Sequence, residues 1–219
     1  MNAGYLSLGL TIIFFILFTT GWKDLIAERI PMPYLTILAA GCMLTNPFSL
    51  SLDRWLNHQE SISIQLSVCW LTIWAIAGMM LHRQEGSLQR VYVLFASILS
   101  AMMGGWLRIL YMNDPVLIVY HATLDAAFMT GISAVLMSPA NSAMRFVVVT
   151  FASVLQPVLV GWLQQEHSLS GITIGSLAWW DSYLLALFTT CVLGLLFRMM
   201  RSAVDKWRFR FAGTGGGEE

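Results

Sequence analysis

Charge is what this sequence has least of. Only 11% of its 219 residues are charged, against 57% that are hydrophobic, and the formal net charge at pH 7 is zero. Soluble domains have about a quarter of their residues charged. A chain with so little charge cannot hide its apolar surface in a water-soluble core, so the composition predicts an integral membrane protein. Without a basic excess, nothing indicates nucleic acid as a partner.

Short motifs that identify particular chemistries are absent as well. The sequence has no HExxH, GxSxG or Walker A motif and no CxxC pair. Its three cysteines, Cys42, Cys69 and Cys191, lie in apolar segments, where free thiols usually pack as small hydrophobic side chains. These absences favour a non-enzymatic protein, and we expect no catalytic residue, metal site or cofactor.

What the sequence does have is a series of long apolar segments. A membrane-spanning helix needs about 20 mostly apolar residues. Seven segments approach this length, at residues 4–22, 32–48, 62–81, 91–112, 116–137, 146–163 and 177–200. We therefore predict an all-α bundle of seven transmembrane helices forming one domain, residues 1–211, with a flexible tail at residues 212–219. The first segment has no preceding positive region, so we expect a retained span rather than a signal peptide.

The distribution of Lys and Arg predicts the orientation of this bundle. With the N-terminus outside, ten of the twelve basic residues fall in inner loops or the C-terminal segment, and only Arg54 and Arg108 fall outside. Cytoplasmic loops carry such an excess of Lys and Arg. We predict a multi-pass plasma-membrane protein with its C-terminus inside. The basic segment at residues 198–211 is expected to anchor this topology; contact with anionic lipid is the alternative.

Small residues recur in the fourth segment at every fourth position, in two registers. Small side chains at this spacing let neighbouring helices approach closely within a membrane. We expect them to pack within the chain, with dimerisation through the same face as the alternative. The residues are Ala96, Ser97, Ser100, Ala101, Gly104 and Gly105.

Ionisable residues gather around the turn between the fourth and fifth segments. If the fifth helix begins at Val116, His121 lies roughly 9 Å and Asp125 roughly 15 Å below the outer end of the helix. The two residues are four positions apart, so they would share a helix face. The sequence thus predicts an ionisable pair deep in the membrane.

Four more polar residues are predicted near this pair. Arg108 would lie roughly 6 Å below the outer end of the fourth helix. Gln156, in the sixth segment, would lie near the depth of Asp125. Asp114 is expected to cap the outer turn, and Asp181 to lie near the outer start of the seventh helix.

An aspartate at the bilayer centre costs about 3 kcal/mol, so Asp125 should face the bundle interior. In the interpretation that we favour, Asp125 and Gln156 form an interhelical polar clamp while Arg108 extends to the interface. This describes a scaffold or a sensor. In the alternative, Asp125 titrates and His121 relays a proton, which describes a small proton-coupled transporter. An intramembrane enzyme ranks third.

Three stretches carry a resemblance to a known family. They are GYLSLGLTIIFFILFTTGWKDL at residues 4–25, DPVLIVYHATLDAAFMTG at residues 114–131 and WWDSYLLALF at residues 179–188. In these stretches the chain resembles the YphA-like integral membrane proteins of endospore-forming Bacillota. The resemblance implies a small multi-helix plasma-membrane protein with a connection to sporulation. It supplies no catalytic residues and identifies no protein partner beyond the lipid bilayer.

Overall fold

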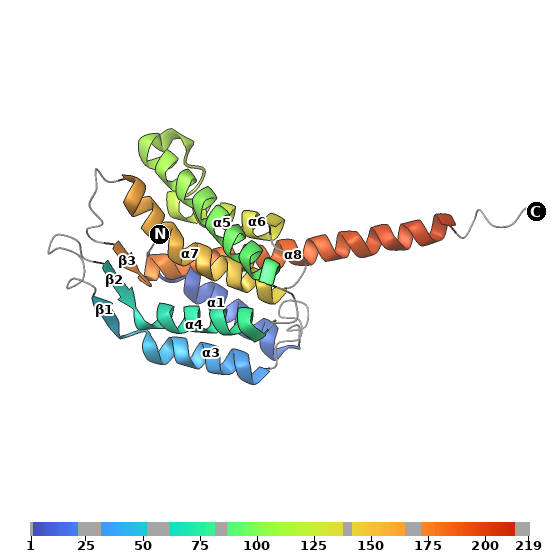
Figure 1. Ribbon diagram of the computed structural model, residues 1–219, viewed down its shortest axis with the longest axis horizontal. Coiled ribbons are helices and arrows are strands. Elements are labelled where there is room, and N and C mark those ends of the chain that lie inside the picture. The colour runs from blue at the N-terminus through green and yellow to red at the C-terminus, as the bar shows by residue number, and fades with distance from the viewer. Residues whose placement is uncertain are drawn as a thin grey trace, which may run out of the picture.

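Apolar segments of the sequence form helices that run back and forth along the molecule (Figure 1). The structure, a computed structural model, describes residues 2–21, 32–51, 62–81, 87–137, 142–164 and 172–212. The α-helices in these residues are α1 (Tyr5–Thr19), α3 (Met32–Thr45), α4 (Leu66–Leu81), α5 (Ser87–Asn113), α6 (Ala122–Met137), α7 (Ser142–Gln164) and α8 (Leu177–Ala212). The expectation of a mainly helical membrane protein is confirmed.

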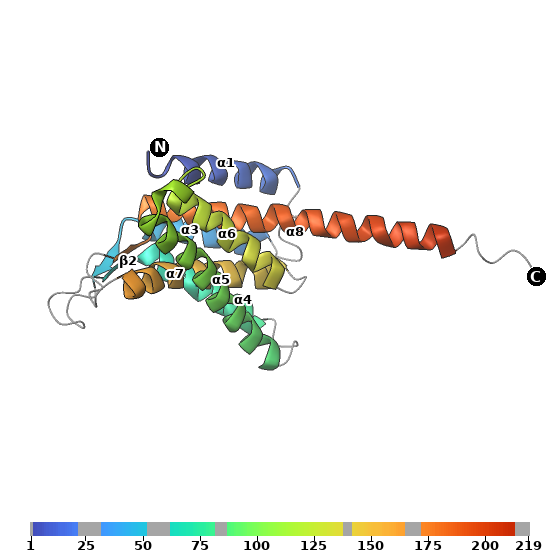
Figure 2. The same cartoon turned by 90° about the horizontal axis from the view of Figure 1, so that it is seen from above.

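Successive helices run in opposite directions, so their connections gather at two ends of the molecule (Figures 1 and 2). One end holds the N-terminus, a small β-sheet and the turn between α5 and α6; we call it the sheet end. The C-terminal half of α8 extends past the other helices at the opposite end. This single helix therefore links the sheet end to the far side of the molecule.

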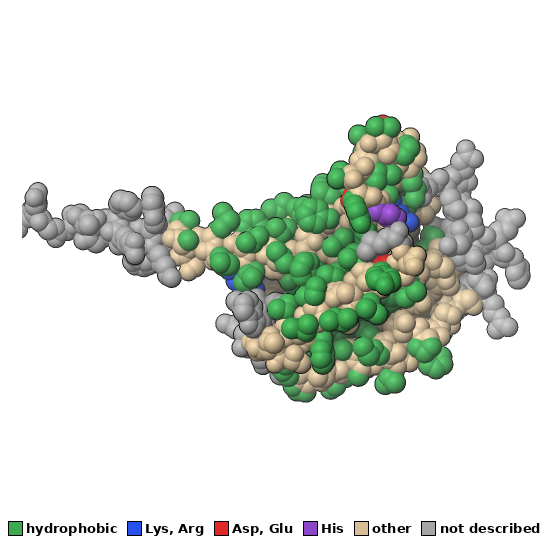
Figure 3. Space-filling view, turned by 180° about the vertical axis from the view of Figure 1, so that it is seen from behind, with side chains coloured by type: hydrophobic (Ala, Val, Ile, Leu, Met, Phe, Trp, Pro, Cys, Tyr) green, Lys and Arg blue, Asp and Glu red, His purple; other side chains and the backbone are tan. Residues whose placement is uncertain are grey.

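The outer faces of the helices are apolar. Figure 3 shows hydrophobic side chains spread over one face of the molecule, with few charged ones among them. Three helices are long and apolar enough to cross a membrane, at Leu88–Asn113, Ser142–Leu163 and Leu177–Asp205. The other four described helices are also apolar but shorter. Large side chains such as Phe15, Phe95 and Trp106 are exposed on these helices, as lipid contact requires.

At two predicted helix starts the chain forms another structure, whereas α5 and α7 each begin four residues earlier than predicted. The third helix begins at Leu66 rather than Ile62, because residues 62–65 read Ile-Ser-Ile-Gln and form a strand. Alternating apolar and polar residues with β-branched side chains favour a strand over a helix. The fifth helix begins at Ala122 rather than Val116, because Pro115–Leu117 forms a 3₁₀ turn, η1.

The sheet has three short strands at one end of the helices. Strand β2 (Ile62–Gln65) pairs antiparallel with β1 (Ser49–Ser51) and parallel with β3 (Ile172–Ile174). It thereby joins segments before α4 and before α8, which are more than 100 residues apart. The sequence did not predict this sheet.

Small residues make close packing of α5 possible. All six small residues singled out in the sequence are buried, and α5 lies against α6 and α7. At Gly104 a Cβ atom would overlap with Thr130 Oγ1 and lie 3.1 Å from both the Ala126 carbonyl oxygen and Gln156 Nε2. Glycine at this position therefore allows the three helices to meet.

The hydrophobic core lies between α4, α5, α6, α7 and α8. Its buried members are mainly small or β-branched: Val68, Leu71, Ala75, Val93, Ala96, Ala127, Ala134, Met144, Val147, Val148, Val149, Ile174, Trp179, Tyr183 and Ala186. Helix α3 has no buried residue and packs on α4, while α1 packs on α8. The five-helix core thus forms the frame around which the peripheral helices are placed.

Candidate functional site

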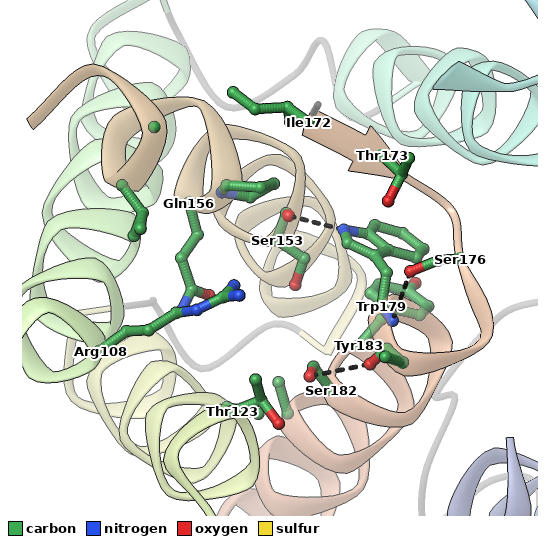
Figure 4. Close-up of a pocket in the computed structure, with 16 residues that line it drawn as sticks. Arg108, Thr123, Ser153, Gln156, Ile172, Thr173, Ser176, Trp179, Ser182 and Tyr183 are labelled. Carbon is green, nitrogen blue, oxygen red and sulfur yellow. Dashed lines mark hydrogen bonds between the residues drawn. The ribbon is translucent and has the colours of Figure 1, made fainter. Parts of the chain in front are cut away.

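A cavity of about 360 Å³ lies near the sheet end, among α5, α6, α7, β3 and the first turns of α8 (Figure 4). Pockets for small molecules have volumes of about 300–1,000 Å³. Eight lining residues carry a hydroxyl, amide or guanidinium group: Arg108, Thr123, Ser153, Gln156, Thr173, Ser176, Ser182 and Tyr183. The cavity is therefore large enough for a small molecule and offers polar partners on several sides.

Arg108 is the only charged residue among the sixteen described residues that line the cavity. It lies on α5, and its side chain extends toward the cavity beside Gln156 (Figure 4). The Nε atom is buried, and no described residue accepts a hydrogen bond from it. A cationic group that no described carboxylate neutralises is costly within a membrane protein, and ionisable groups of this kind are candidates for functional sites.

Pro157 shapes the α7 wall. A proline at this position has no N–H to donate to the carbonyl four residues earlier, which belongs to Ser153. The indole Nε1–H of Trp179, on α8, donates to that carbonyl oxygen at 3.0 Å in a buried position. The Trp179 side chain thereby supplies the hydrogen bond that Pro157 cannot make within α7. This bond joins α7 to α8 beside the cavity.

The Gln156 amide lies where α5, α6 and α7 meet. Thr130 Oγ1 donates to the Ala126 carbonyl at 2.9 Å and lies 3.5 Å from Gln156 Oε1. Gln156 Nε2 approaches the Gly104 backbone from the same side. The amide therefore stands at the cavity wall next to Arg108 (Figure 4).

Aromatic rings form the α8 wall. The rings of Trp179 and Tyr183 stack with centroids 5.2 Å apart and an interplanar angle of 3°. The Tyr183 hydroxyl lies 3.3 Å from Thr150 Oγ1 on α7. This buried stack gives one side of the cavity a flat apolar surface, opposite the guanidinium side.

Asp125 and His121 lie at the sheet end of α6 rather than deep along a helix. Because α6 begins at Ala122, Asp125 is in its first turn and His121 precedes it. The predicted depths of roughly 9 and 15 Å, which assumed a helix from Val116, are therefore wrong. One Asp125 carboxylate oxygen, Oδ2, accepts hydrogen bonds from the backbone N–H groups of Val119 and Tyr120, both at 3.1 Å.

His121 is exposed, and its Nδ1 lies 2.8 Å from Thr123 Oγ1. Neither His121 nor Asp125 is among the described residues that line the cavity, although Thr123 is. Asp125 bonds within its own segment and Gln156 lies against Thr130, so the structure does not have the predicted clamp between Asp125 and Gln156. Of the predicted polar cluster, it brings Arg108 and Gln156 into one cavity.

The other two predicted aspartates cap the starts of helices, α1 and the 3₁₀ helix η1. Asp181, in the second turn of α8, is 8% exposed and accepts hydrogen bonds from Gly4 N at 2.7 Å and Ser7 N at 2.6 Å. It thereby caps the N-terminus of α1, where Gly4 has a positive φ of 93°. Asp114 caps η1 from an exposed position, accepting from Val116 N at 3.3 Å.

Sequence reasoning missed most of the cavity wall. The α8 residues that line it recur at intervals of three and four, and such spacing places residues on one helix face. This stripe of small, hydroxyl and aromatic residues is the sequence pattern that could have indicated the α8 wall of the cavity. Its members are Ala178, Trp179, Ser182, Tyr183 and Ala186.

The described residues offer no obvious metal centre. No group of three or more His, Cys, Asp or Glu side chains comes together in the part of the chain that the structure describes. Cys42, Cys69 and Cys191 are free thiols within helices.

Comparison with known proteins identifies the family. The family model described as YphA-like integral membrane protein matches residues 3–212, nearly the whole chain, so the chain belongs to this family. No curated protein matches the chain, and no solved structure matches it. The family description agrees with the apolar helices in placing the protein in a lipid bilayer.

Proposed function

We propose that this YphA-like protein crosses the plasma membrane seven times, with the sheet end outside and the C-terminus inside. The seven described helices overlap the seven apolar segments and alternate in direction. Arg90 and Arg145 lie in the first turns of α5 and α7, at the end away from the sheet, which agrees with the excess of positive charge expected inside. The connection with sporulation that the resemblance implies stays a prediction.

Within this topology, we propose a non-enzymatic sensor that binds a small molecule in the cavity at its outer end. The observation that supports this role best is the course of α8. Its first turns line the cavity, and the same helix continues to Ala212 beyond the rest of the bundle. A molecule in the cavity would therefore contact the element that reaches farthest toward the inside.

The geometry favours a sensor over a proton-coupled transporter. The transporter hypothesis needs Asp125 as a titrating group on a path through the bundle. The Asp125 carboxylate instead bonds two backbone N–H groups at the start of α6. A carboxylate that holds a loop in this way is suited to a structural role.

Filling the cavity without a ligand tests whether α8 relays its occupancy. In a cysteine-free variant, spin labels are placed at Ser202, on the α8 extension, and at Leu136, an exposed position on α6. Pulsed electron paramagnetic resonance then measures the distance between the labels with and without Ser182→Phe, which adds bulk to the cavity wall. We expect the distance distribution to shift.

Val192→Phe is the matched control, because Val192 is an exposed position on the same helix and does not line the cavity. It should leave the distribution unchanged. Superimposable distributions for Ser182→Phe and the parent protein would contradict the proposed relay.

A further inference from the structure

We propose, on the basis of the sensor function above, that the cavity binds a small organic monocarboxylate. In this arrangement the acid group faces Arg108 and Gln156, and the less polar remainder of the molecule lies against the aromatic α8 wall. The inference rests on the charge of the lining, the geometry of its donors and the separation of its polar and apolar sides.

The charge of the lining favours an anion. Arg108 provides a positive charge to the cavity, and the described lining contains no Asp or Glu. The three described aspartates nearest to this end of the molecule are already hydrogen-bonded to backbone N–H groups: Asp114 to Val116, Asp125 to Val119 and Tyr120, and Asp181 to Gly4 and Ser7. A ligand with one negative charge would therefore balance a cation that no described side chain neutralises.

The geometry of the donors favours a carboxylate. A guanidinium group presents its N–H groups in a planar fork that matches the two oxygens of a carboxylate. The Gln156 amide stands beside Arg108 (Figure 4) and adds a neutral donor on the same side. One cation and one amide suit a monoanion better than a phosphate dianion, which clusters of several cations usually bind.

The size and the far wall define the rest of the ligand. A cavity of about 360 Å³ holds roughly a dozen water volumes, which is the scale of a small ring or a short chain. Trp179 supplies apolar surface on the side opposite Arg108 (Figure 4), and Pro157 and Val160 add apolar surface from α7. Hydroxyl groups of Ser176 and Ser182 lie on the α8 side of the same space (Figure 4). Ser176 Oγ accepts from Trp179 N at 3.3 Å and can still donate, whereas Ser182 Oγ donates to the Ala178 carbonyl at 3.1 Å and can still accept.

Benzoate, benzamide and inorganic phosphate are suitable probes. Benzamide has nearly the same shape as benzoate without its charge, and phosphate is an anion without an apolar part. Calorimetry on the full-length protein in lipid nanodiscs should show benzoate binding at least tenfold more tightly than either of the other two. A hydrogen bond to a charged group supports a difference of this size.

Variants assign the binding to the cavity. Arg108→Gln should remove the preference for benzoate over benzamide, and Ser182→Phe should abolish the binding of both. Arg90→Gln removes a cation from the other end of α5 and should leave binding unchanged. Arg108→Lys keeps the charge without the fork, so it should bind benzoate with intermediate affinity, and it serves as the test if the glutamine variant does not fold.

Three results would overturn the assignment. Equal affinity for benzoate and benzamide would show that the cavity does not select an anion. Tighter binding of phosphate than of benzoate would show that it does not select a carboxylate. If none of the three probes binds, the proposal that the cavity binds a small organic monocarboxylate is wrong. None of these results decides the sensor function, because the spin-label experiment on Ser182→Phe uses no ligand.

Discussion

The hydrogen bond from Trp179 to the Ser153 carbonyl should matter only because Pro157 is present. If Pro157 frees that carbonyl within α7, replacing the proline by alanine restores an N–H that can bond it. Trp179→Phe, which removes the indole donor, should then be less harmful in the Pro157→Ala background than in the parent protein. The expected signature is a coupling free energy between the two substitutions.

The magnitude follows from the setting of the bond. Hydrogen bonds between helices of a membrane protein contribute about 0.6 kcal/mol on average and about 1.7 kcal/mol at most. The bond here is buried and 3.0 Å long, and its loss leaves a buried carbonyl without this donor, so we expect a coupling of about 1 kcal/mol. The loss of ring volume in Trp179→Phe is common to both backgrounds and cancels in the cycle.

The assay is unfolding in mixed detergent micelles with increasing sodium dodecyl sulfate, followed by circular dichroism. Trp180→Phe is the control, because the indole Nε1 of Trp180 is buried and donates to no described residue. Its cycle with Pro157→Ala should give a coupling near zero. Equal couplings for the two tryptophans, or none for Trp179, would refute the argument that α8 completes the α7 backbone.

Further substitutions test other contacts by the same unfolding assay. Asp181→Ala should cost about 3 kcal/mol, because two short hydrogen bonds to a charged group are lost, and should speed hydrogen exchange in α1; Asp114→Ala, at an exposed cap, should cost about 0.5 kcal/mol. Gly104→Ala should destabilise by about 1–3 kcal/mol through overlap with Thr130, whereas Gly9→Ala, with open space around it, should be neutral or stabilising. Asp125→Asn should cost about 1 kcal/mol by weakening two bonds and abolish no pH-dependent flux; loss of such a flux with folding intact would restore the transporter hypothesis. Replacing Lys206, Arg208 and Arg210 by glutamine should weaken association of the C-terminal segment with anionic lipid by about 1 kcal/mol per residue, measured by protease protection in charged and neutral nanodiscs.

The helices could be predicted because the signal for them is local. Runs of apolar residues near the length of a membrane span are visible without knowledge of any partner. The errors in the type of structure fall at the sheet end, where Ile62–Gln65 and Pro115–Leu117 adopt structures other than an α-helix. Hydropathy does not distinguish a short apolar strand from the first turn of a helix, so those boundaries depend on contacts made elsewhere in the chain.

The polar residues could be recognised, but their partners could not. Depth along an assumed helix placed Asp125 near Gln156. Eight residues, 114–121, instead connect α5 to α6, so Asp125 lies at the end of the bundle. Asp181 caps α1 through hydrogen bonds from Gly4 and Ser7, which precede it in the sequence by 177 and 174 positions. No spacing in the sequence reports such a contact.

The cavity itself combines residues from five elements. Arg108 and Gln156 were recognisable as polar side chains in apolar segments, whereas Ser153 and Trp179 look ordinary in the sequence. Their roles arise from Pro157, whose missing N–H is visible in the sequence but whose substitute donor on α8 is visible only in three dimensions.

The orientation of the sheet end underlies both the proposed sensor and its cavity, and cysteine labelling tests it most directly. Leu88 lies in the first turn of α5 and Val116 lies in η1, just beyond the other end of that helix; they are 86% and 88% exposed. In a cysteine-free background, a membrane-impermeant maleimide added to intact cells should label Val116→Cys at once. Leu88→Cys should react only after the cells are permeabilised. Labelling of Leu88→Cys in intact cells, with Val116→Cys protected, would place the cavity on the inner side and contradict the account.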